Sequence, residues 1–358
     1  MAKFFKKLTK LFTKTKEEEE TKPTLLTKRP HKEFVLSDFE ILTTLGKGSF
    51  GRVRLVKTFG GEQKHFALKI MKKNKIIRLH QFEHVLSEVT LLNLLSCPFI
   101  VNMISHFQDE NRLYVVMEFV SGGELFRLLR RVGKFNNAQT MFFVCELVLA
   151  LEYLHGLKIM FRDLKPENVM LHASGHIKLV DFGLAKTITD RTYTLCGTAE
   201  YLAPEMIENQ GHGMGVDWWA LGVITYEMLG GQPPFVAATP FEVYKQICHK
   251  PKAKLEFEPK HQFNKSVRGF IGGLLMRDRL KRLGCGKGAK QVKKDKWFVG
   301  VDWDAVKMQQ LEVPFLPDEL DDDNLAGNFD DYPDSDEDTA LPLNGHDREG
   351  FDRFEVYK

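Results

Sequence analysis

The octapeptide Phe161-Arg162-Asp163-Leu164-Lys165-Pro166-Glu167-Asn168 decides how this sequence is interpreted. It places an acid, a cation and an amide within one short turn. Asp163 suits accepting the proton of a substrate hydroxyl, Lys165 suits facing a phosphate, and Asn168 suits holding a metal ion. Phosphoryl transfer from ATP needs such groups close together. The stretch therefore predicts this chemistry, provided that its partners occur in order on both sides; alone, it reads equally as a polar loop.

A second carboxylate follows in Asp181-Phe182-Gly183, after two short strand-like stretches. Asp181 stands beside an apolar ring and a glycine. It suits a Mg²⁺ ion that bridges phosphates, with Asn168 as the second ligand. Upstream, Phe66-Ala67-Leu68-Lys69-Ile70 has strand character interrupted by one lysine, which is costly in an apolar strand unless paired. Its expected partner is Glu88 on the helical stretch 80–95, and the alternative is a surface lysine.

The stretch Gly46-Lys47-Gly48-Ser49-Phe50-Gly51-Arg52-Val53 lies between strand-like residues 39–45 and 53–58. A G-x-G-x-x-G in a dinucleotide fold opens a helix, whereas this one predicts a hairpin. Glycines let backbone amides approach phosphate oxygens without obstruction. The pattern indicates a lid over phosphates; a glycine-rich hairpin without a ligand is the alternative.

A buried strand is expected over 113–119, followed by Ser121-Gly122-Gly123 as a linker between two lobes. Backbone groups of Glu118 and Val120 are expected to pair with the adenine edge, with Met117 at the back of the pocket. Ala67 leaves room for the flat ring. The predicted nucleotide-binding residues are Leu45, Gly46, Lys47, Gly48, Ser49, Phe50, Gly51, Arg52, Val53, Ala67, Lys69, Met117, Glu118, Val120 and Met170.

Composition agrees with a globular protein of one large core or two lobes. The chain has 358 residues, 28% charged side chains and a net charge of only +3, which argues against a dedicated nucleic-acid binder. Its five cysteines are scattered and lack C-x-x-C spacing, which argues against a disulfide framework or a cysteine metal site. No apolar run is long enough to span a bilayer, and Ala2 excludes the myristoylation pattern. A cytoplasmic location is expected.

The N-terminal tail, residues 1–38, begins with apolar side chains at helical spacing among lysines. Residues 17–20 then form an acidic block. Two interpretations stay open for this basic amphipathic helix: contact with an anionic membrane, or packing of its apolar stripe on the main domain, which is the more common fate of such helices.

Together these motifs, in this order and with Ala203-Pro204-Glu205, resemble those of eukaryotic protein kinases. The segments 192–198 and 216–222 are similar to the AGC group, and within it to cyclic-AMP-dependent kinase catalytic subunits. The resemblance implies an α+β, bilobal fold: a β-rich N-lobe (39–120) with one main helix and a helical C-lobe (121–298). It continues into an AGC-type tail (299–358), in which Phe329 approaches the adenine.

The resemblance also implies roles for individual residues. Thr194 matches an activation-loop phosphorylation site, with His84, Arg162 and Lys186 as the cations around its phosphate. Asp217 matches the residue that braces the catalytic loop, and Glu205 with Arg282 matches a buried ion pair. The acidic groups that select arginines before the phosphoacceptor correspond to Glu124, Glu167 and Glu227. The alternative for these glutamates is a solvated surface.

Four departures from the family's pattern stand out: Phe161 replaces His or Tyr, Ala199 a proline, Val180 a polar residue, and Tyr193 a tryptophan. We expect Phe161 to stack on Phe182 without loss of activity, and Ala199 to loosen the loop that faces the residue after the phosphoacceptor. Val180 is expected to alter inhibitor preference more than chemistry.

The tail ends in Phe351-Asp352-Arg353-Phe354-Glu355, which resembles the hydrophobic motif of AGC kinases. Its two aromatic rings are expected to dock on the small lobe behind the Glu88 helix. Glu355 takes the place of a residue that many relatives phosphorylate, so it would supply a built-in negative charge. The acidic stretch 334–338 is interpreted as a solvated linker by composition.

The predicted function is a Ser/Thr protein kinase that uses ATP and Mg²⁺ on proteins with upstream arginines. Alternatives are a cyclic-GMP-dependent-like or other AGC kinase, a pseudokinase scaffold, or a small-molecule phosphotransferase. Lys69, Asp163, Asn168 and Asp181 are all present, which argues against a pseudokinase. Lys165, two residues after Asp163, argues against a tyrosine kinase. Expected partners are basic protein substrates, an upstream activating kinase and a separate cyclic-nucleotide-binding regulatory subunit, the last put in doubt by Tyr193.

Overall fold

The computed structural model describes residues 33–60, 63–188, 191–249, 257, 263–318, 324–332 and 350–357. The expected basic helix near the N-terminus and the acidic stretch 334–338 lie outside these residues. The side chain of Glu355 also lies outside what the structure describes, so the expected built-in charge stays a prediction.

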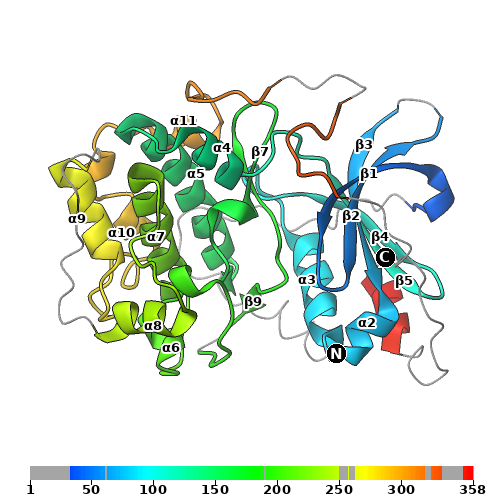
Figure 1. Cartoon of the computed structure of the whole chain (residues 1–358), viewed down its shortest axis with the longest axis horizontal. Coiled ribbons are helices and arrows are strands. Elements are labelled where there is room, and N and C mark those ends of the chain that lie inside the picture. Colours follow the sequence, from blue (N-terminus) through cyan, green and yellow to red (C-terminus); the bar gives the residue numbers. More distant parts are fainter. Residues whose placement is uncertain are drawn as a thin grey trace, which may run out of the picture. The chain divides into compact units, whose positions relative to one another are not determined.

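An antiparallel five-stranded sheet in the order β1-β2-β3-β5-β4 forms the small lobe (Figure 1). The strands are β1 (Phe39–Lys47), β2 (Gly51–Thr58), β3 (His65–Lys72), β4 (Met103–Gln108) and β5 (Arg112–Glu118). Apolar side chains such as Leu55, Leu68 and Val116 are buried on its two faces. Each predicted strand of this lobe is present, and tight antiparallel registers join β2 to β3 and β3 to β5.

Two helices accompany this sheet, α2 (Lys73–Arg78) and α3 (Phe82–Leu94). Val85, Val89 and Leu92 of α3 are buried in the same apolar cluster as Met71 of β3 and Leu113 of β5. The helix therefore lies with one side against the sheet, which places Glu88, itself buried, toward β3.

The large lobe is mainly helical (Figure 1). Its helices are α4 (Leu125–Val132), α5 (Asn137–Gly156), α6 (Pro204–Ile207), α7 (Gly215–Gly230), α8 (Pro240–His249), α9 (Lys265–Leu274), α10 (Ala289–Val292) and α11 (Trp303–Lys307). Short strand pairs add β6 (Ile159–Met160) with β9 (Lys186–Thr187), and β7 (Val169–Leu171) with β8 (Ile177–Leu179). Single 3₁₀ turns occupy Leu36–Asp38, Pro166–Asn168, Ala199–Tyr201 and Lys296–Phe298.

The core of this lobe forms around α5 and α7, whose side chains are buried on nearly every side. A capping box begins α5: the Asn136 side chain accepts from the Gln139 amide, and the Gln139 side chain accepts from the Asn136 amide, both at 2.9 Å. Gly231, with φ of 84°, ends α7 in the left-handed conformation that glycine adopts without strain. The C-terminal end of α5 leads into the 161–168 loop, and the first turn of α7 carries Asp217, which contacts that loop.

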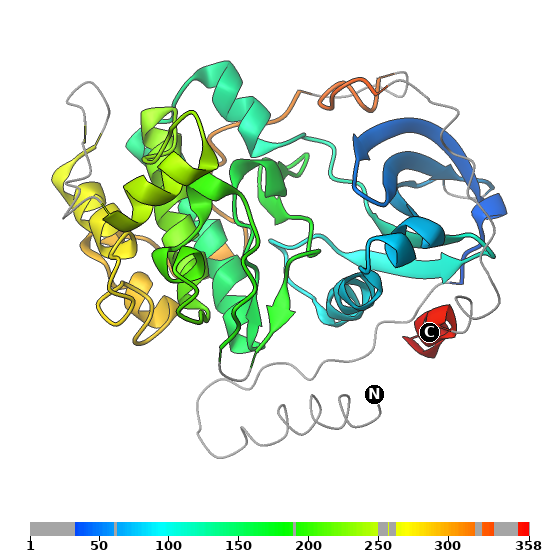
Figure 2. The same cartoon turned by 60° about the horizontal axis from the view of Figure 1, so that its bottom comes forward.

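The residues after α11 run back from the large lobe toward the small one (Figure 2). Phe315 packs on Phe135 with ring centroids 5.1 Å apart. Asn328 donates from its side chain to the Ser121 carbonyl at 3.0 Å. A side chain at Gly122 would collide with Pro317, since a Cβ there would lie 2.5 Å from its Cγ. The tail therefore lies directly on the linker between the lobes, and this close approach requires glycine there.

The chain ends in the 3₁₀ helix Gly350–Tyr357, which lies beside the small lobe (Figures 1 and 2). Phe351 and Phe354 are 1% and 3% exposed. Both rings meet Phe82 of α3 edge-to-face, with centroids 5.1 and 5.7 Å away. Their backbone carbonyls hydrogen-bond to Gln108 and His106 of β4. The expected docking of the aromatic pair behind the Glu88 helix is thus observed.

The expected α+β, two-lobed architecture is confirmed: a sheet-rich lobe with one main helix precedes a larger helical lobe. Among the helices that the structure describes, none has both the length and the apolar character needed to cross a bilayer.

Candidate active site

Strand β3 and helix α3 bring Lys69 and Glu88 together. The Lys69 Nζ atom lies 2.6 Å from Oε1 of Glu88, whose side chain is only 7% exposed. Burial lowers the pKa of the Lys69 ammonium, but the negative charges of Glu88 and then Asp181 outweigh it, so the pKa is raised above its usual 10.5. Lys69 is therefore a firmly protonated, paired cation, and it lies within electrostatic reach of Asp181.

The glycine-rich loop joins β1 to β2 through a turn in which the amides of Gly48 and Gly51 donate to each other's carbonyls at 2.9 and 3.4 Å. A Cβ at Gly46 would meet no atom within 4 Å. At Gly51 a Cβ would lie 1.8 Å from the carbonyl oxygen of Ile70, so only glycine lets β2 approach β3 there. The loop is therefore closely packed at Gly51, whereas the space next to Gly46 and Gly48 is open.

The other side chains of this loop point in different directions. Lys47 and Ser49 are exposed, and Phe50 packs partly against the main core. Arg52 is buried, and its Nη1 donates to Thr44 Oγ1 at 3.4 Å. The structure therefore leaves backbone groups, and not the Arg52 side chain, as the obvious phosphate contacts of the loop.

A separate apolar cluster lies under the loop. Leu45, Leu55 and Ala67 are buried in it, and the partly buried members include Val53, Met117 and Phe329. Phe329 reaches it from the C-terminal tail and stacks on Phe119 with ring centroids 5.9 Å apart. Five predicted adenine-side residues are thereby gathered in this cluster: Leu45, Val53, Ala67, Met117 and Phe329. Met170, also predicted, packs instead against the main core and forms a backbone bridge with Glu124.

The linker strand offers fewer backbone groups than expected. The Glu118 amide already donates to the Asn102 carbonyl at 3.0 Å, and the Glu118 side chain accepts from Asn102 and from Lys178. In the described part of the chain no hydrogen bond involves the backbone of Val120. Val120 is thus the better placed of the two for pairing with a planar heterocycle.

The segment after β6 is braced by one buried carboxylate. Asp217 of α7 accepts from the amide of Phe161 at 3.0 Å, from the amide of Arg162 at 2.8 Å and from the His155 ring at 2.7 Å. Arg162 has φ of 70°, a left-handed conformation that costs a non-glycine residue free energy. The hydrogen bonds that these amides donate to Asp217 hold this conformation and aim the following residues away from the core.

Those residues form a compact polar group. Lys165 Nζ lies 3.1 Å from Asp163 Oδ2 and 3.0 Å from Thr198 Oγ1. The Asn168 side-chain NH₂ donates to the carbonyl and to Oδ2 of Asp163, both at 2.8 Å. With its NH₂ occupied in this way, Asn168 keeps its amide oxygen for another partner.

Asp181 is brought to this group by the β7–β8 hairpin. The amide of Val180 donates to the carbonyl of Asn168 at 3.0 Å, so Asp181 follows directly. Asp181 has φ of 60°, and its Oδ1 accepts from the Gly183 amide at 3.2 Å. Phe182 meets Phe161 edge-to-face with centroids 5.1 Å apart. The expected contact of these two rings is observed, and the four predicted polar groups converge from both lobes.

The predicted phosphate pocket is partly assembled. Lys186 donates to Thr192 Oγ1 at 2.9 Å, and Thr194 is exposed nearby in sequence. The Nε of Arg162 donates to the Leu184 carbonyl, whereas its Nη1 is buried without a hydrogen-bond partner in the described residues. His84 lies on α3, is bonded to Gln81, and makes no described hydrogen bond or ion pair with Thr194.

The three predicted substrate glutamates differ in their surroundings. Glu227 is 1% exposed, lies 2.9 Å from Arg130 and accepts from the Tyr201 hydroxyl. Glu167 is half-buried, and its Oε2 has no hydrogen-bond partner among the described residues. Burial, followed by the charges of Glu167 and Asp330, raises the pKa of Glu124. Glu124 and Glu167 therefore share one acidic neighbourhood, whose negative charge the nearby cations Arg127 and Lys165 offset only in part.

Comparison with known proteins identifies the family. A family model described as "Protein kinase domain" matches residues 39–298. The chain belongs to the protein kinase family. It is 47% identical to the human protein named cAMP-dependent protein kinase catalytic subunit PRKX, over 90% of this chain and 88% of that one. Against the Drosophila melanogaster catalytic subunit 3 the identity is 44%, covering 90% and 54%. Against the Saccharomyces cerevisiae cAMP-dependent protein kinase type 3 it is 42%, covering 87% and 77%.

These relatives are AGC kinases, so the kinase belongs to the AGC group and is a Ser/Thr protein kinase that uses ATP and Mg²⁺. Sequence reasoning missed some neighbours of its site. No local motif indicated that Thr198 would contact Lys165. None indicated the ion pair between Lys178 and Glu118 behind the linker, at 2.8 Å. Only the folded positions of these residues could reveal them.

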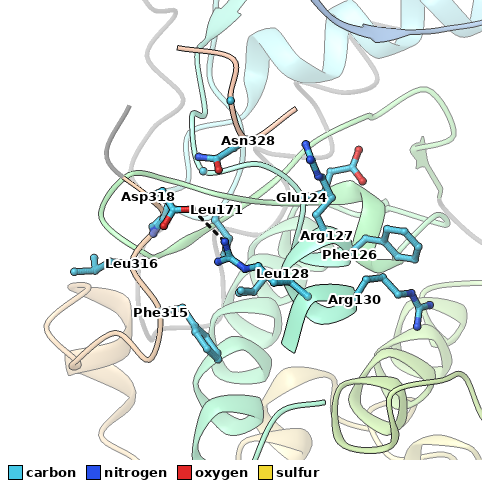
Figure 3. A pocket seen from close by; sticks show the side chains of 14 residues that line it. Glu124, Phe126, Arg127, Leu128, Arg130, Leu171, Phe315, Leu316, Asp318 and Asn328 are labelled. Atoms are coloured by element: carbon cyan, nitrogen blue, oxygen red, sulfur yellow. Dashed lines mark hydrogen bonds and ion pairs between the residues drawn. The ribbon is translucent and has the colours of Figure 1, made fainter. Parts of the chain in front are cut away.

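A cavity of about 390 Å³ lies between α4 and the tail of the kinase (Figure 3). It is lined by Gly122, Glu124, Arg127, Arg131, Phe315 and Asn328, among others. Arg131 closes one side by an ion pair with Asp318 of the tail at 3.1 Å. Sequence reasoning did not anticipate this cavity, because the tail reaches it from about 190 positions downstream of α4.

Proposed function

We propose that the kinase transfers the γ-phosphate of ATP to Ser or Thr hydroxyls through Lys69, Glu88, Asp163, Lys165, Asn168 and Asp181. The observation that carries this assignment is the convergence of the Lys69–Glu88 pair, at 2.6 Å, with Asp181 and with the Asp163–Lys165–Asn168 group. Transfer of a phosphoryl group to a hydroxyl requires a base, cations and a metal-binding carboxylate close together.

Each group has a defined task. Lys69, held by Glu88, binds the phosphates of the nucleotide, and the open backbone of Gly46 and Gly48 covers them. Asp163 accepts the proton of the substrate hydroxyl. Lys165, tied to Asp163 and Thr198, neutralises charge on the transferring group. Adenine binds in the apolar cluster of Leu45, Ala67 and Met117, beneath Phe329, with Val120 at its edge.

Mg²⁺ fits the oxygen donors of Asp181 and Asn168. The Asn168 NH₂ is bound to Asp163, which leaves its amide oxygen to coordinate a hard cation, and Asp181 supplies a carboxylate. When bound, the ion neutralises phosphate charge. The orientation of both ligands depends on the Asn168–Val180 and Asp181–Gly183 hydrogen bonds, which join the loop to the hairpin.

We further propose selection of arginines before the phosphoacceptor, by Glu124, Glu167 and Glu227. The unpaired Oε2 of Glu167 and the raised pKa of Glu124 support it, because a bound guanidinium would remove both penalties. A serine peptide with arginines at positions −2 and −3 is expected to be phosphorylated far better than one with glutamates there. Equal turnover of the two peptides would end this part of the proposal.

Thr194 is proposed as an activating phosphorylation site, with Lys186, Arg162 and His84 as the cations that meet the phosphate. Arg162 supports this role, since its buried Nη1 has no partner in the described residues. Modification in cis or by an upstream kinase is distinguished by incubating the Asp163→Asn variant with ATP. A variant that still gains phosphate at Thr194 in cells, but not after purification, indicates an upstream enzyme.

We propose a regulatory partner from the relatives, whose names include cAMP dependence. We also propose the cytoplasmic location that the sequence led us to expect. Tyr193, 62% exposed on the activation segment, replaces the tryptophan expected at that place. The test is a pull-down of the purified kinase by a cyclic-nucleotide-binding regulatory subunit, with and without cyclic AMP. Capture that cyclic AMP releases supports the partner; no capture under either condition contradicts it.

The experiment that tests the main proposal measures ³²P transfer from ATP to the arginine–serine peptide. Wild type should label the peptide, and Asp163→Asn and Asp181→Asn should reduce the rate by at least about a hundredfold, as expected when charge stabilisation is lost. Chelation of Mg²⁺ should have the same effect. A wild-type protein, phosphorylated at Thr194, that labels no peptide would favour the pseudokinase alternative.

A further inference from the structure

Helix α4 places an arginine of the kinase beside the acidic groups proposed to hold a substrate arginine. Glu124 is the N-cap residue of α4, and Arg127 follows three positions later, on the same side of the helix. Arg127 Nη1 lies 3.7 Å from Asp330 Oδ1 of the tail. Figure 3 shows the Arg127 side chain extending alongside Glu124, and both residues line the 390 Å³ cavity.

The surroundings of Glu124 are strongly acidic. Its neighbours Glu167 and Asp330 both oppose its ionisation, and Arg127 is the first of the cations that favour it. Tyr332 of the tail lies close enough to Asp330 and Glu124 for both negative charges to act on it. A guanidinium from a peptide would therefore meet three carboxylates whose charge Arg127 already offsets in part.

The other arginines of α4 have different partners. Arg130 pairs with the buried Glu227, and its Nη1 also donates to the Gly231 carbonyl at 2.7 Å. Arg131 pairs with Asp318, away from Glu124. Of the three arginines on this helix, Arg127 is the one whose partner belongs to the acidic group around Glu124.

We propose that Arg127 occupies part of the site for a substrate arginine and so sets how strongly the kinase selects arginine there. This inference rests on the proposed selection by Glu124. We assign it to position −3, because Glu124 lies at the start of α4, whereas Glu167 lies on the same loop as Asp163. The Arg127 and Asp330 side chains are 42% and 69% exposed, so their ion pair is weak and a peptide can displace it.

The consequence is a reduced benefit from a peptide arginine at −3. An incoming guanidinium either shares the carboxylates with Arg127 or displaces it, and both options cost part of the attraction. Removal of the Arg127 charge leaves Glu124 and Asp330 fully available. The effect belongs to binding of one peptide position, so it should appear in KM for peptides with arginine at −3 and leave kcat nearly unchanged.

The test is the ratio of kcat/KM for two peptides that differ only at −3, Arg against Ala, measured with full-length protein phosphorylated at Thr194. Arg127→Gln should raise this ratio about three- to tenfold, the range expected when one exposed ion pair stops competing. Arg127→Lys keeps the charge and should retain the wild-type ratio. Arg131→Gln removes a neighbouring arginine of the same helix and should also retain it.

The outcomes separate the two proposals. A wild type that prefers arginine at −3, with an unchanged ratio in Arg127→Gln, would overturn this inference and leave arginine selection intact. A ratio near one in both proteins would overturn both. A second substitution, Arg127→Glu, guards against an effect of altered α4 packing, because adding an acid should raise the ratio beyond that of Arg127→Gln. A ratio that instead falls in Arg127→Glu would contradict the inference.

Discussion

The Lys69 ammonium lies 2.6 Å from the Glu88 carboxylate, and this contact joins the central strand of the small lobe to its main helix. Neither side chain is free: the lysine is paired inside the sheet, and the glutamate is buried. The position of α3 therefore determines whether the lysine points into the cleft. We therefore expect the elements that hold α3, among them the C-terminal 3₁₀ helix, to affect catalysis through this pair.

Replacement of Lys69 by Met should lower kcat/KM for peptide phosphorylation by at least about a hundredfold, since a phosphate-binding cation held by a buried acid is lost. The fold should persist, because a methionine fits an apolar strand. The measurement is initial-rate kinetics with ATP. Lys57→Met, on neighbouring β2, is the matched control and should keep the wild-type rate; a full rate in Lys69→Met would refute the assignment.

The double substitution Phe351→Ala with Phe354→Ala should lower activity several-fold. Removing a packed phenylalanine costs about 3–5 kcal/mol. The helix should therefore leave Phe82, and α3 should lose this support. Kinetic assays measure the loss of activity, and limited proteolysis of the C-terminus measures the release of the helix. The neighbouring exposed Asp352→Ala is the control; an unchanged rate in the double variant would speak against coupling to Lys69–Glu88.

Loss of the Thr194 hydroxyl, in Thr194→Ala, should reduce activity several-fold because the Arg162 Nη1 atom and Lys186 then lack the phosphate that orders the segment. Mass spectrometry of the wild type should find a phosphate at Thr194, and its removal by phosphatase should lower the rate equally. Full activity of unphosphorylated wild type would contradict this role.

The ion pair of Arg282 with Glu205 should dominate the stability of the large lobe. Both side chains are buried, at 0% and 4% exposure, and two parallel hydrogen bonds of 2.6 and 2.7 Å join them. Breaking such a pair leaves a buried charge, so Arg282→Ala should cost about 3–5 kcal/mol of unfolding free energy. Urea denaturation measures this. Lys281→Ala, which removes a surface pair with Asp278, should cost less than about 1 kcal/mol.

Arginine selection at −3 should weaken with acidification. Glu124 binds a guanidinium only when ionised, and burial with the charges of Glu167 and Asp330 raises its pKa above the usual 4.5. As the pH falls, the KM of an arginine peptide should therefore rise. The rise should begin at a higher pH than it would if Glu124 had the pKa of an ordinary glutamate. Glu124→Gln should remove this pH-dependent part while lowering selection at all pH values; an identical profile in both proteins would exclude Glu124 as its source.

The sequence alone determined the fold class and the family, because the motifs occur in order along a chain whose strands and helices carry strong local signals. The strand over 66–70, the glycine hairpin and the helix that carries Glu88 all appear where their patterns predicted. Local chemistry also singled out Lys69, Asp163, Asn168 and Asp181. A catalytic role requires one particular type of side chain at one position, so the residue type itself can be recognised in the sequence.

Tertiary structure decided which of these groups meet, and what else they meet. The Thr198 contact of Lys165, the pairing of Arg127 with Asp330 and the docking of Phe351 on Phe82 join residues far apart in sequence. The first contact depends on how the segment around Thr198 folds against the 161–168 loop, and the other two depend on where the tail lies. No local pattern encodes either arrangement. The same holds for Glu118, whose amide proved to be taken by Asn102: hydrogen-bond availability is a property of packed neighbours, and it emerges only when the chain has folded.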